Sequence, residues 1–276
     1  MLILPFVCGS DQMHTKMKTN RQLVKMHTAA YRQCWKGEPM ESIKRINTTK
    51  YGYMPCSITI KVREPGSAFT HLAGFLGVLV GAGPLLMRAR EFGSIFTRSG
   101  MAVFILSALM LYGASTSFHW VVAGQRVTDV FRKLDHMSIS ILIAGTYTPV
   151  CLTALRGRGG YIMLAVIWGL AAVSMIIKAF WYYCPKWISS SIYIGMGWLS
   201  IFFLPTIVRS LPIGAFLWLL IGGIMYTIGG VIYALKLRVF NEKHVRFGSH
   251  EIFHLLVMAG TFCHFILMYH YLVFIR

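Results

Sequence analysis

The run HEIFHLLVMAGTFCHFILMYHYLVF, residues 250–274, decides the fold class. Its apolar part, 251–274, is long enough to cross a bilayer, because a hydrocarbon core of about 30 Å needs roughly 20 apolar residues in a helix. Its first five residues place two histidines four apart around a glutamate, which is the spacing of a zinc protease. This stretch therefore raises two questions, how the chain crosses a membrane and whether it holds a metal there.

The composition of the whole chain also indicates a membrane protein. Of its 276 residues, 56% are hydrophobic and 13% are charged, whereas soluble domains carry about a quarter of charged residues. The formal net charge is +18, but the charges occupy the gaps between apolar runs. That placement favours a role in membrane topology over nucleic-acid binding. The six cysteines show no CxxC spacing and are expected to be free thiols.

Further stretches of the chain are as long and as apolar as the last one. We predict a helix for each of the spans 68–87, 101–123, 135–155, 160–178, 188–208, 211–235 and 251–274. The fifth and sixth spans are separated by little more than residues 209–212, so the chain must turn there. Pro149 and Pro205 lie inside spans and are expected to kink them. The predicted fold is an all-α integral membrane protein, a seven-transmembrane helix bundle.

The distribution of Lys and Arg predicts the orientation of this bundle. With the N-terminus in the cytoplasm, the inner side holds 20 of these residues and the outer side 7, and the short loops alone give 9 against 7. We therefore expect a cytoplasmic N-terminus and a C-terminus outside. Residues 1–63 are basic and polar, which predicts a poorly ordered cytoplasmic segment. Residues 64–276 would form the seven-transmembrane domain.

The protease interpretation of HEIFH fails because a third ligand is missing. His250 and His254 share one helix face, but a zinc site needs at least one more protein ligand. Residues 255–276 contain no Asp or Glu, and the third histidine of a metzincin would fall at Gly260. His264 follows His254 by ten residues, about 15 Å along a helix, and is too far to share the ion. Glu251 is then expected to be an N-terminal helix acid that interacts with the helix dipole.

Better partners lie upstream, at the same predicted depth in the membrane. His119 is near the inner end of the second span, and Asp135 begins the third span on the inner side. Neutral imidazoles from His119, His250 and His254 would leave one tetrahedral position open, as in catalytic zinc sites. We therefore predict these three histidines as ligands of Zn²⁺.

Polar neighbours would complete a catalytic site. Asp135 could orient or deprotonate a water whose pKa the metal lowers, or fix the tautomer of a histidine. Ser115, one turn before His119, could hydrogen-bond that water or a substrate carbonyl. His71 lies at the same depth, but a fourth ligand is not needed, so a hydrogen-bonding role is favoured for it. His136 leaves the helix about 100° away from Asp135 and is left out of the site.

Four segments of the chain resemble the hemolysin III family of bacterial membrane proteins. They are EPGSAFTH (64–71), STSFH (115–119), LDHMSISILIAGTYTP (134–149) and GSHEIFHLLVMAGTFCH (248–264). The family belongs to the PAQR superfamily, with the adiponectin and progestin receptors. Its pattern of Ser-x-x-x-His, Asp and His-x-x-x-His falls on the predicted site residues Ser115, His119, Asp135, His250 and His254.

This resemblance implies zinc held by the three histidines, a water linked to the serine and the aspartate, and a cytoplasmic N-terminus. It also implies kinship with alkaline ceramidases, which hydrolyse lipid amides. The family usually has Asn where this chain has Ser67, which weakens the case for a structural hydrogen bond from that position.

Three functions follow from these predictions. The first is a zinc-dependent membrane hydrolase of lipid amides or esters. The second is a non-enzymatic, receptor-like sensor or regulator of membrane lipids with structural zinc. The family name suggests a cytolysin as the third, but seven apolar spans and no secretion signal argue against an autonomous toxin. The expected partners are membrane lipids and not nucleic acid, in a bacterial cell membrane.

Overall fold

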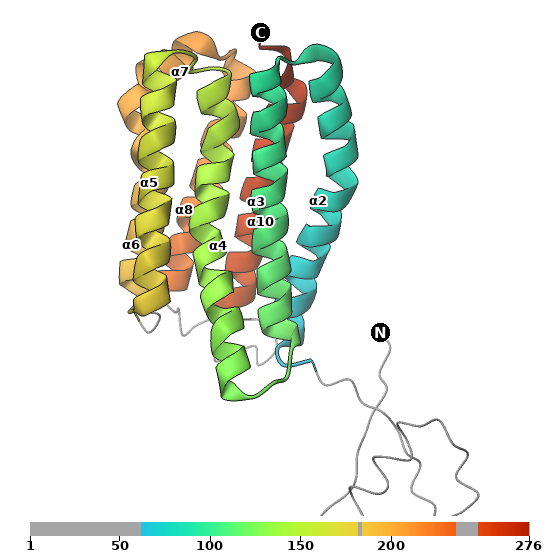
Figure 1. The fold of residues 1–276 in the computed structure, drawn as a ribbon, viewed down its shortest axis with the longest axis vertical. Coiled ribbons are helices and arrows are strands. Elements are labelled where there is room, and N and C mark those ends of the chain that lie inside the picture. The colour runs from blue at the N-terminus through green and yellow to red at the C-terminus, as the bar shows by residue number, and fades with distance from the viewer. Residues whose placement is uncertain (1–61, 182–183, 236–247, 276) are drawn as a thin grey trace, which may run out of the picture. The chain divides into compact units, whose positions relative to one another are not determined.

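The computed structural model describes residues 62–181, 184–235 and 248–275, and these residues contain helices but no strand. The predicted all-helical fold is thus confirmed for the described residues. The N-terminal segment predicted at 1–63 lies, apart from its last two residues, outside them, so its poor order stays a prediction. The longest helices are α2 (Pro65–Phe92), α3 (Ile95–Trp120), α4 (Gln125–Leu152), α5 (Arg158–Phe180), α8 (Ile213–Leu235) and α10 (Ser249–His270) (Figure 1).

An interrupted column lies between α5 and α8 in the sequence. It consists of α6 (Lys186–Trp198), the 3₁₀ turn η2 (Leu199–Phe203) and α7 (Leu204–Ser210), and a last 3₁₀ turn, η3 (Leu272–Phe274), follows α10. Pro205 explains the interruption, because it has no N–H for the carbonyl four residues earlier and its ring crowds that carbonyl. The turn predicted around 209–212 is confirmed, since α7 ends at Ser210 and α8 starts at Ile213.

Six helical columns among the described residues are long and apolar enough to cross a membrane. They are α2, α3, α5, the column from α6 to α7, α8 and the column from α10 to η3. The chain is therefore a multi-pass membrane protein. The remaining long helix, α4, has 28 residues, but its first turns are rich in charged side chains. The sequence places the third span at 135–155, whereas the helix already begins at Gln125.

Local sequence explains where several helices begin. Pro65 opens α2 at a position where its missing N–H costs nothing. Ser94 caps α3, because its hydroxyl oxygen accepts a hydrogen bond from the N–H of Thr97 at 3.2 Å. Gly157, just before α5, has a φ of 101°, a backbone conformation that favours glycine. These signals fix where α2, α3 and α5 begin.

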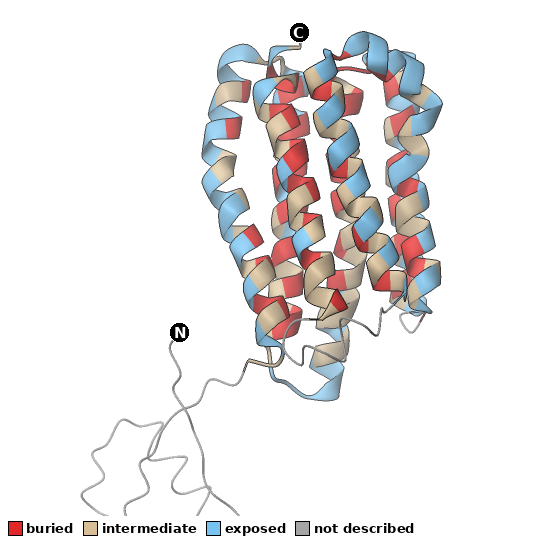
Figure 2. Ribbon diagram, turned by 180° about the vertical axis from the view of Figure 1, so that it is seen from behind, coloured by how far each residue is buried: buried red, intermediate tan, exposed pale blue. Residues whose placement is uncertain are grey.

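The helices pack so that α3 contacts α2 and α4, while α10 contacts α8 and α2. Figure 2 shows buried positions in red where helices face one another and exposed positions in pale blue along their outer faces. Large apolar side chains are among the exposed ones, such as Val80 at 77% and Phe180 at 89%. A bilayer can cover such surfaces, and the interior of the bundle is left to hold the polar residues of the site.

Candidate metal centre

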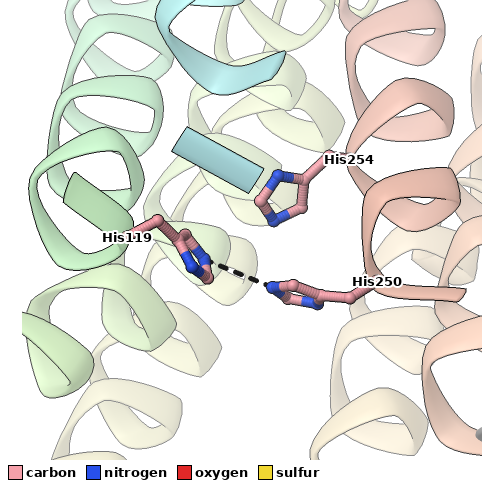
Figure 3. Close-up of side chains that lie close together, drawn as sticks. All are labelled: His119, His250 and His254. Atoms are coloured by element: carbon pink, nitrogen blue, oxygen red, sulfur yellow. Dashed lines mark hydrogen bonds between the residues drawn. The ribbon is translucent and has the colours of Figure 1, made fainter. Parts of the chain in front are cut away.

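Three histidines from two helices meet inside the bundle. His119 lies in the last turn of α3, and His250 and His254 lie one turn apart at the start of α10. One ligand atom from each lies within 4.8 Å of the other two. The Nε2 atoms of His119 and His250 are 3.2 Å apart, and the imidazole of His254 points toward the same space (Figure 3). The structure thus brings together the three residues that the sequence predicts as zinc ligands.

A carboxylate just before α2 orients His119. Oε2 of Glu64 lies 2.5 Å from Nδ1 of His119, so the carboxylate accepts the Nδ1–H and leaves the lone pair of Nε2 for the site. The backbone N–H of Glu64 also donates to the carbonyl of His119 at 3.0 Å. The hydrogen bond with His119 lowers the pKa of Glu64 below its ordinary value, which favours the charged form. Carboxylate–histidine pairs of this kind hold metal-binding imidazoles in protein sites.

A threonine on α2 orients His254 in the same way. The hydroxyl of Thr70 donates to the carbonyl of Ser67 at 2.9 Å. Its oxygen, 3.1 Å from Nδ1 of His254, can therefore only accept from that nitrogen. Because Nδ1 then carries the proton, Nε2 of His254 keeps its lone pair. By contrast, Nδ1 of His250 has no hydrogen-bond partner among the described residues.

His71 joins the cluster by stacking on His254. Its ring lies parallel to that of His254, with centroids 3.6 Å apart and planes 9° apart. It is buried, and neither ring nitrogen has a hydrogen-bond partner in the described part of the chain. The hydrogen-bonding role favoured from the sequence therefore finds no protein partner among the described residues and stays a prediction.

Asp135 and Ser115 lie in different surroundings. Asp135 is buried and lines a cavity together with the three histidines. Ser115 is fully buried one turn before His119, does not line that cavity, and its hydroxyl has no partner among the described residues. His136, which the sequence argument left out, does line the cavity. Its Nδ1–H donates to the carbonyl of Arg132 at 2.8 Å, so Nε2 accepts from the hydroxyl of Tyr233 at 3.3 Å.

This cavity extends from the histidines through the interior of the bundle. Its volume is about 650 Å³, within the range of sites that enclose small ligands. The histidines and Asp135 form a polar part, whereas most of the wall is apolar and includes Leu155, Ile207 and Phe216. Such a shape suits an amphiphile with its polar group at the histidines.

Glu251 joins two helices instead of serving as a protease base. Its Oε2 accepts the N–H of Gly248 at 2.8 Å, which caps α10, and its Oε1 accepts the hydroxyl of Ser67 at 2.5 Å. The expected position of Glu251 as an N-terminal helix acid is confirmed. The doubt about a structural hydrogen bond from Ser67 was wrong, because serine supplies the donor that links α2 to α10.

Glu64 and Thr70, which orient the histidines, were not predicted from the sequence. Both belong to the segment EPGSAFTH, at the start of α2. The signal that could have found them is a charged or hydroxyl residue at the start of a span that also contains a histidine. The donor set itself fits Zn²⁺, because three histidine nitrogens are typical ligands of catalytic zinc sites.

Comparison with known proteins gives a consistent result along most of the chain. A family model described as "Haemolysin-III related" matches residues 59–265. The Hemolysin-3 homolog of Bacillus subtilis (strain 168) is 33% identical over 215 residues, which cover 78% of this chain and 96% of the relative. Hemolysin-3 of Bacillus cereus is 34% identical over 200 residues, covering 72% and 86%.

More distant similarity reaches animal receptors. The Progestin and adipoQ receptor-like protein 1 of Caenorhabditis elegans is 28% identical over 224 residues, which cover 73% of this chain and 50% of the relative. These matches all include much of the helical region that carries the histidine cluster.

Proposed function

This chain belongs to the haemolysin III-related family, and from that premise we propose that it is a zinc-dependent hydrolase of lipid amides or esters in the cell membrane. The observation that carries the proposal is the meeting of His119, His250 and His254 beside a long apolar cavity. Metal ligands next to an apolar cavity suit a substrate with a reactive carbonyl on an apolar chain.

His119, His250 and His254 would hold the zinc through their ring nitrogens. When bound, zinc supplies a Lewis acid for the substrate carbonyl and lowers the pKa of a water molecule. Glu64 and Thr70 keep the Nδ1 protons of His119 and His254 in place, so that their Nε2 atoms stay available for the metal.

The protein's other groups bind the lipid and move protons. Asp135, at the polar part of the cavity, would accept the proton of the attacking water. Ser115, one turn before His119, would hydrogen-bond that water or the substrate carbonyl, because its hydroxyl has no partner among the described residues. The apolar wall would hold the acyl chain and exclude bulk water. Membrane lipids are therefore the proposed substrates.

We extend the proposal to the topology of the bundle. α4 spans 28 residues, about 42 Å, and packs against two helices that qualify as spans, α3 and α5. If α4 is counted as a span, the total is seven and the termini would lie on opposite sides. The excess of Lys and Arg then supports an N-terminus and a histidine cluster on the cytoplasmic side. Labelling of cysteines introduced in the α2–α3 and α3–α4 loops of intact cells tests this orientation, since only the former should react.

A receptor-like role is the second candidate. The relative in Caenorhabditis elegans carries a receptor name, and the same cavity would bind a lipid without turning it over. The name Hemolysin-3 of the Bacillus cereus relative points to lysis as a third possibility, which release of haemoglobin from erythrocytes by the purified protein would test.

Metal analysis followed by lipid-hydrolysis assays separates the first two functions. We expect about one zinc ion per chain and turnover of a lipid amide or ester in the wild type, and the loss of both in His119→Ala. His270→Ala is the matched control, because His270 is exposed in the last turn of α10 and should leave both unchanged. Zinc without turnover of any lipid class would support the receptor-like role, and absence of zinc would refute both.

A further inference from the structure

A further imidazole lines the same cavity, far from the cluster. His264 lies on α10 ten residues after His254, about 15 Å along the helix. It is 4% exposed and forms part of the cavity wall. Its Nδ1 has no hydrogen-bond partner among the described residues. A buried polar group without a partner costs free energy, and such a residue inside a membrane span is a candidate for a functional role.

The polar neighbours of His264 are already paired with one another. The hydroxyl of Thr261 donates to the carbonyl of Val257 at 3.0 Å. Its oxygen accepts the hydroxyl of Tyr112 at 2.7 Å and lies 2.9 Å from that of Tyr226. These bonds satisfy the two tyrosines and the threonine, so His264 is the polar side chain at this level that still lacks a partner within the described residues.

The imidazole is nevertheless held in a defined place. Its ring stacks on that of Tyr226, with centroids 5.4 Å apart and planes 25° apart. On α8 it lies against Gly222, where a Cβ would come within 2.7 Å of Nε2. The absence of a side chain at Gly222 makes room for the ring. Thr146 and Leu219 line the cavity with it, so the surroundings of His264 are otherwise largely apolar.

We propose that His264 binds a hydroxyl group near the middle of the acyl chain of the lipid whose carbonyl lies at the histidine cluster. The proposal rests on the proposed function only in placing a lipid in this cavity. A hydroxyl can both donate and accept, so it can pair with either ring nitrogen of a neutral imidazole. An unsubstituted chain leaves the imidazole unpaired, whereas a mid-chain hydroxyl satisfies it. His264 is thus a residue that determines substrate specificity.

The position of His264 also determines where along the acyl chain the hydroxyl must lie. A separation of about 15 Å from His254 corresponds to about twelve carbon–carbon steps of an extended chain, so a group a little beyond the middle of an octadecanoyl chain reaches His264. A hydroxyl next to the carbonyl stays at the histidine cluster and gains nothing from it.

Binding to the full-length protein in nanodiscs tests this inference without any need for turnover. The probes are octadecanoic acid, the same acid with a mid-chain hydroxyl, and the same acid with a hydroxyl next to the carboxyl group, each displacing a fluorescent fatty acid. We expect the wild type to bind the mid-chain hydroxy acid about tenfold more tightly than the other two, as for one buried hydrogen bond. His264→Phe, which keeps the stacking, should abolish this preference and keep the affinity for octadecanoic acid.

Further variants test whether the preference depends on the hydrogen bond of His264. His264→Gln, which can still hydrogen-bond, should retain part of the preference, and His270→Leu on the same helix should retain all of it. Equal binding of all three acids by the wild type would overturn the inference even where a variant fails to fold, and so would a preference that survives in His264→Phe. Failure of every acid to bind would overturn it together with the lipid part of the proposed function. Absence of hydrolysis would refute the enzyme alone, and absence of zinc would refute both zinc-dependent functions, but neither result would change this binding comparison.

Discussion

Thr70→Val is expected to weaken zinc binding, although Thr70 is not one of the predicted ligands. The substitution keeps the size and branching of the side chain and removes only the oxygen that accepts from Nδ1 of His254 at 3.1 Å. His254 is 1% exposed, so water cannot readily replace this partner. The histidine then either keeps an unpaired Nδ1–H or moves its proton to Nε2, the atom that would bind the metal.

The size of the effect follows from the burial of the lost hydrogen bond. Leaving a buried donor unpaired costs about 1–3 kcal/mol, and about 1.4 kcal/mol corresponds to a factor of ten in affinity. Without metal, the ring can relieve part of this cost by changing tautomer or tilting, whereas with metal bound it cannot. We therefore expect zinc affinity to fall by about 10- to 100-fold, the range seen when partners of metal-binding histidines are removed.

Competition with a chromophoric chelator measures this affinity for the wild type, Thr70→Val and Thr70→Ser. Thr70→Ser is the matched control, because it restores the hydroxyl at the same position, and it should bind zinc within about threefold of the wild type. If Thr70→Val binds zinc as tightly as Thr70→Ser does, the tautomer of His254 is not set by this hydroxyl and the reasoning is refuted.

Other variants probe the remaining contacts of the site and of the bundle. Glu64→Gln should lower zinc affinity by about tenfold, because it removes the charge beside the α3 histidine; unchanged affinity in the same chelator assay would contradict this. Ser67→Ala should lower the thermal unfolding midpoint, since its hydrogen bond to Glu251 joins α2 to α10, and should leave zinc affinity unchanged; a loss of zinc would show that the contact serves the site instead. Gly145→Ala should destabilise the protein by about 1–3 kcal/mol, since its Cβ would come 2.1 Å from a serine oxygen on α3. Gly77→Ala, with no atom within 4 Å, should leave unfolding by denaturant unchanged, and equal effects of the two glycine changes would refute the packing argument.

The spans were predictable to the extent that they are apolar. Six of the predicted stretches coincide with helical columns that qualify as membrane spans, because burial in lipid demands a long run of apolar residues whatever the packing. The third predicted span, 135–155, overlaps α4, which begins earlier, at Gln125, with polar turns that a hydropathy argument assigns to a loop. The seven-span count and the orientation remain predictions.

The site was predictable where two residues share a helix or where the order of spans fixes a depth. The spacing of His250 and His254 places them on one face, and the alternation of spans places His119 at their level. Residues at the same depth need not touch one another, and the order of spans does not show which of them do. His71 and Asp135 are predicted at the same depth and both line the cavity, yet only His71 stacks on the ring of His254.

By itself, the sequence determined that the chain is a helical membrane protein and which histidines occur at a common level, because hydropathy and helical periodicity are properties of neighbours along the chain. Only the tertiary structure decided that Glu64 and Thr70 set the protonation of two of these imidazoles, and that His264 faces the cavity without a partner among the described residues. Hydrogen-bond pairing and the shape of an interior depend on which helix faces turn toward one another. That arrangement is fixed by packing across the bundle, between residues that lie far apart in the sequence.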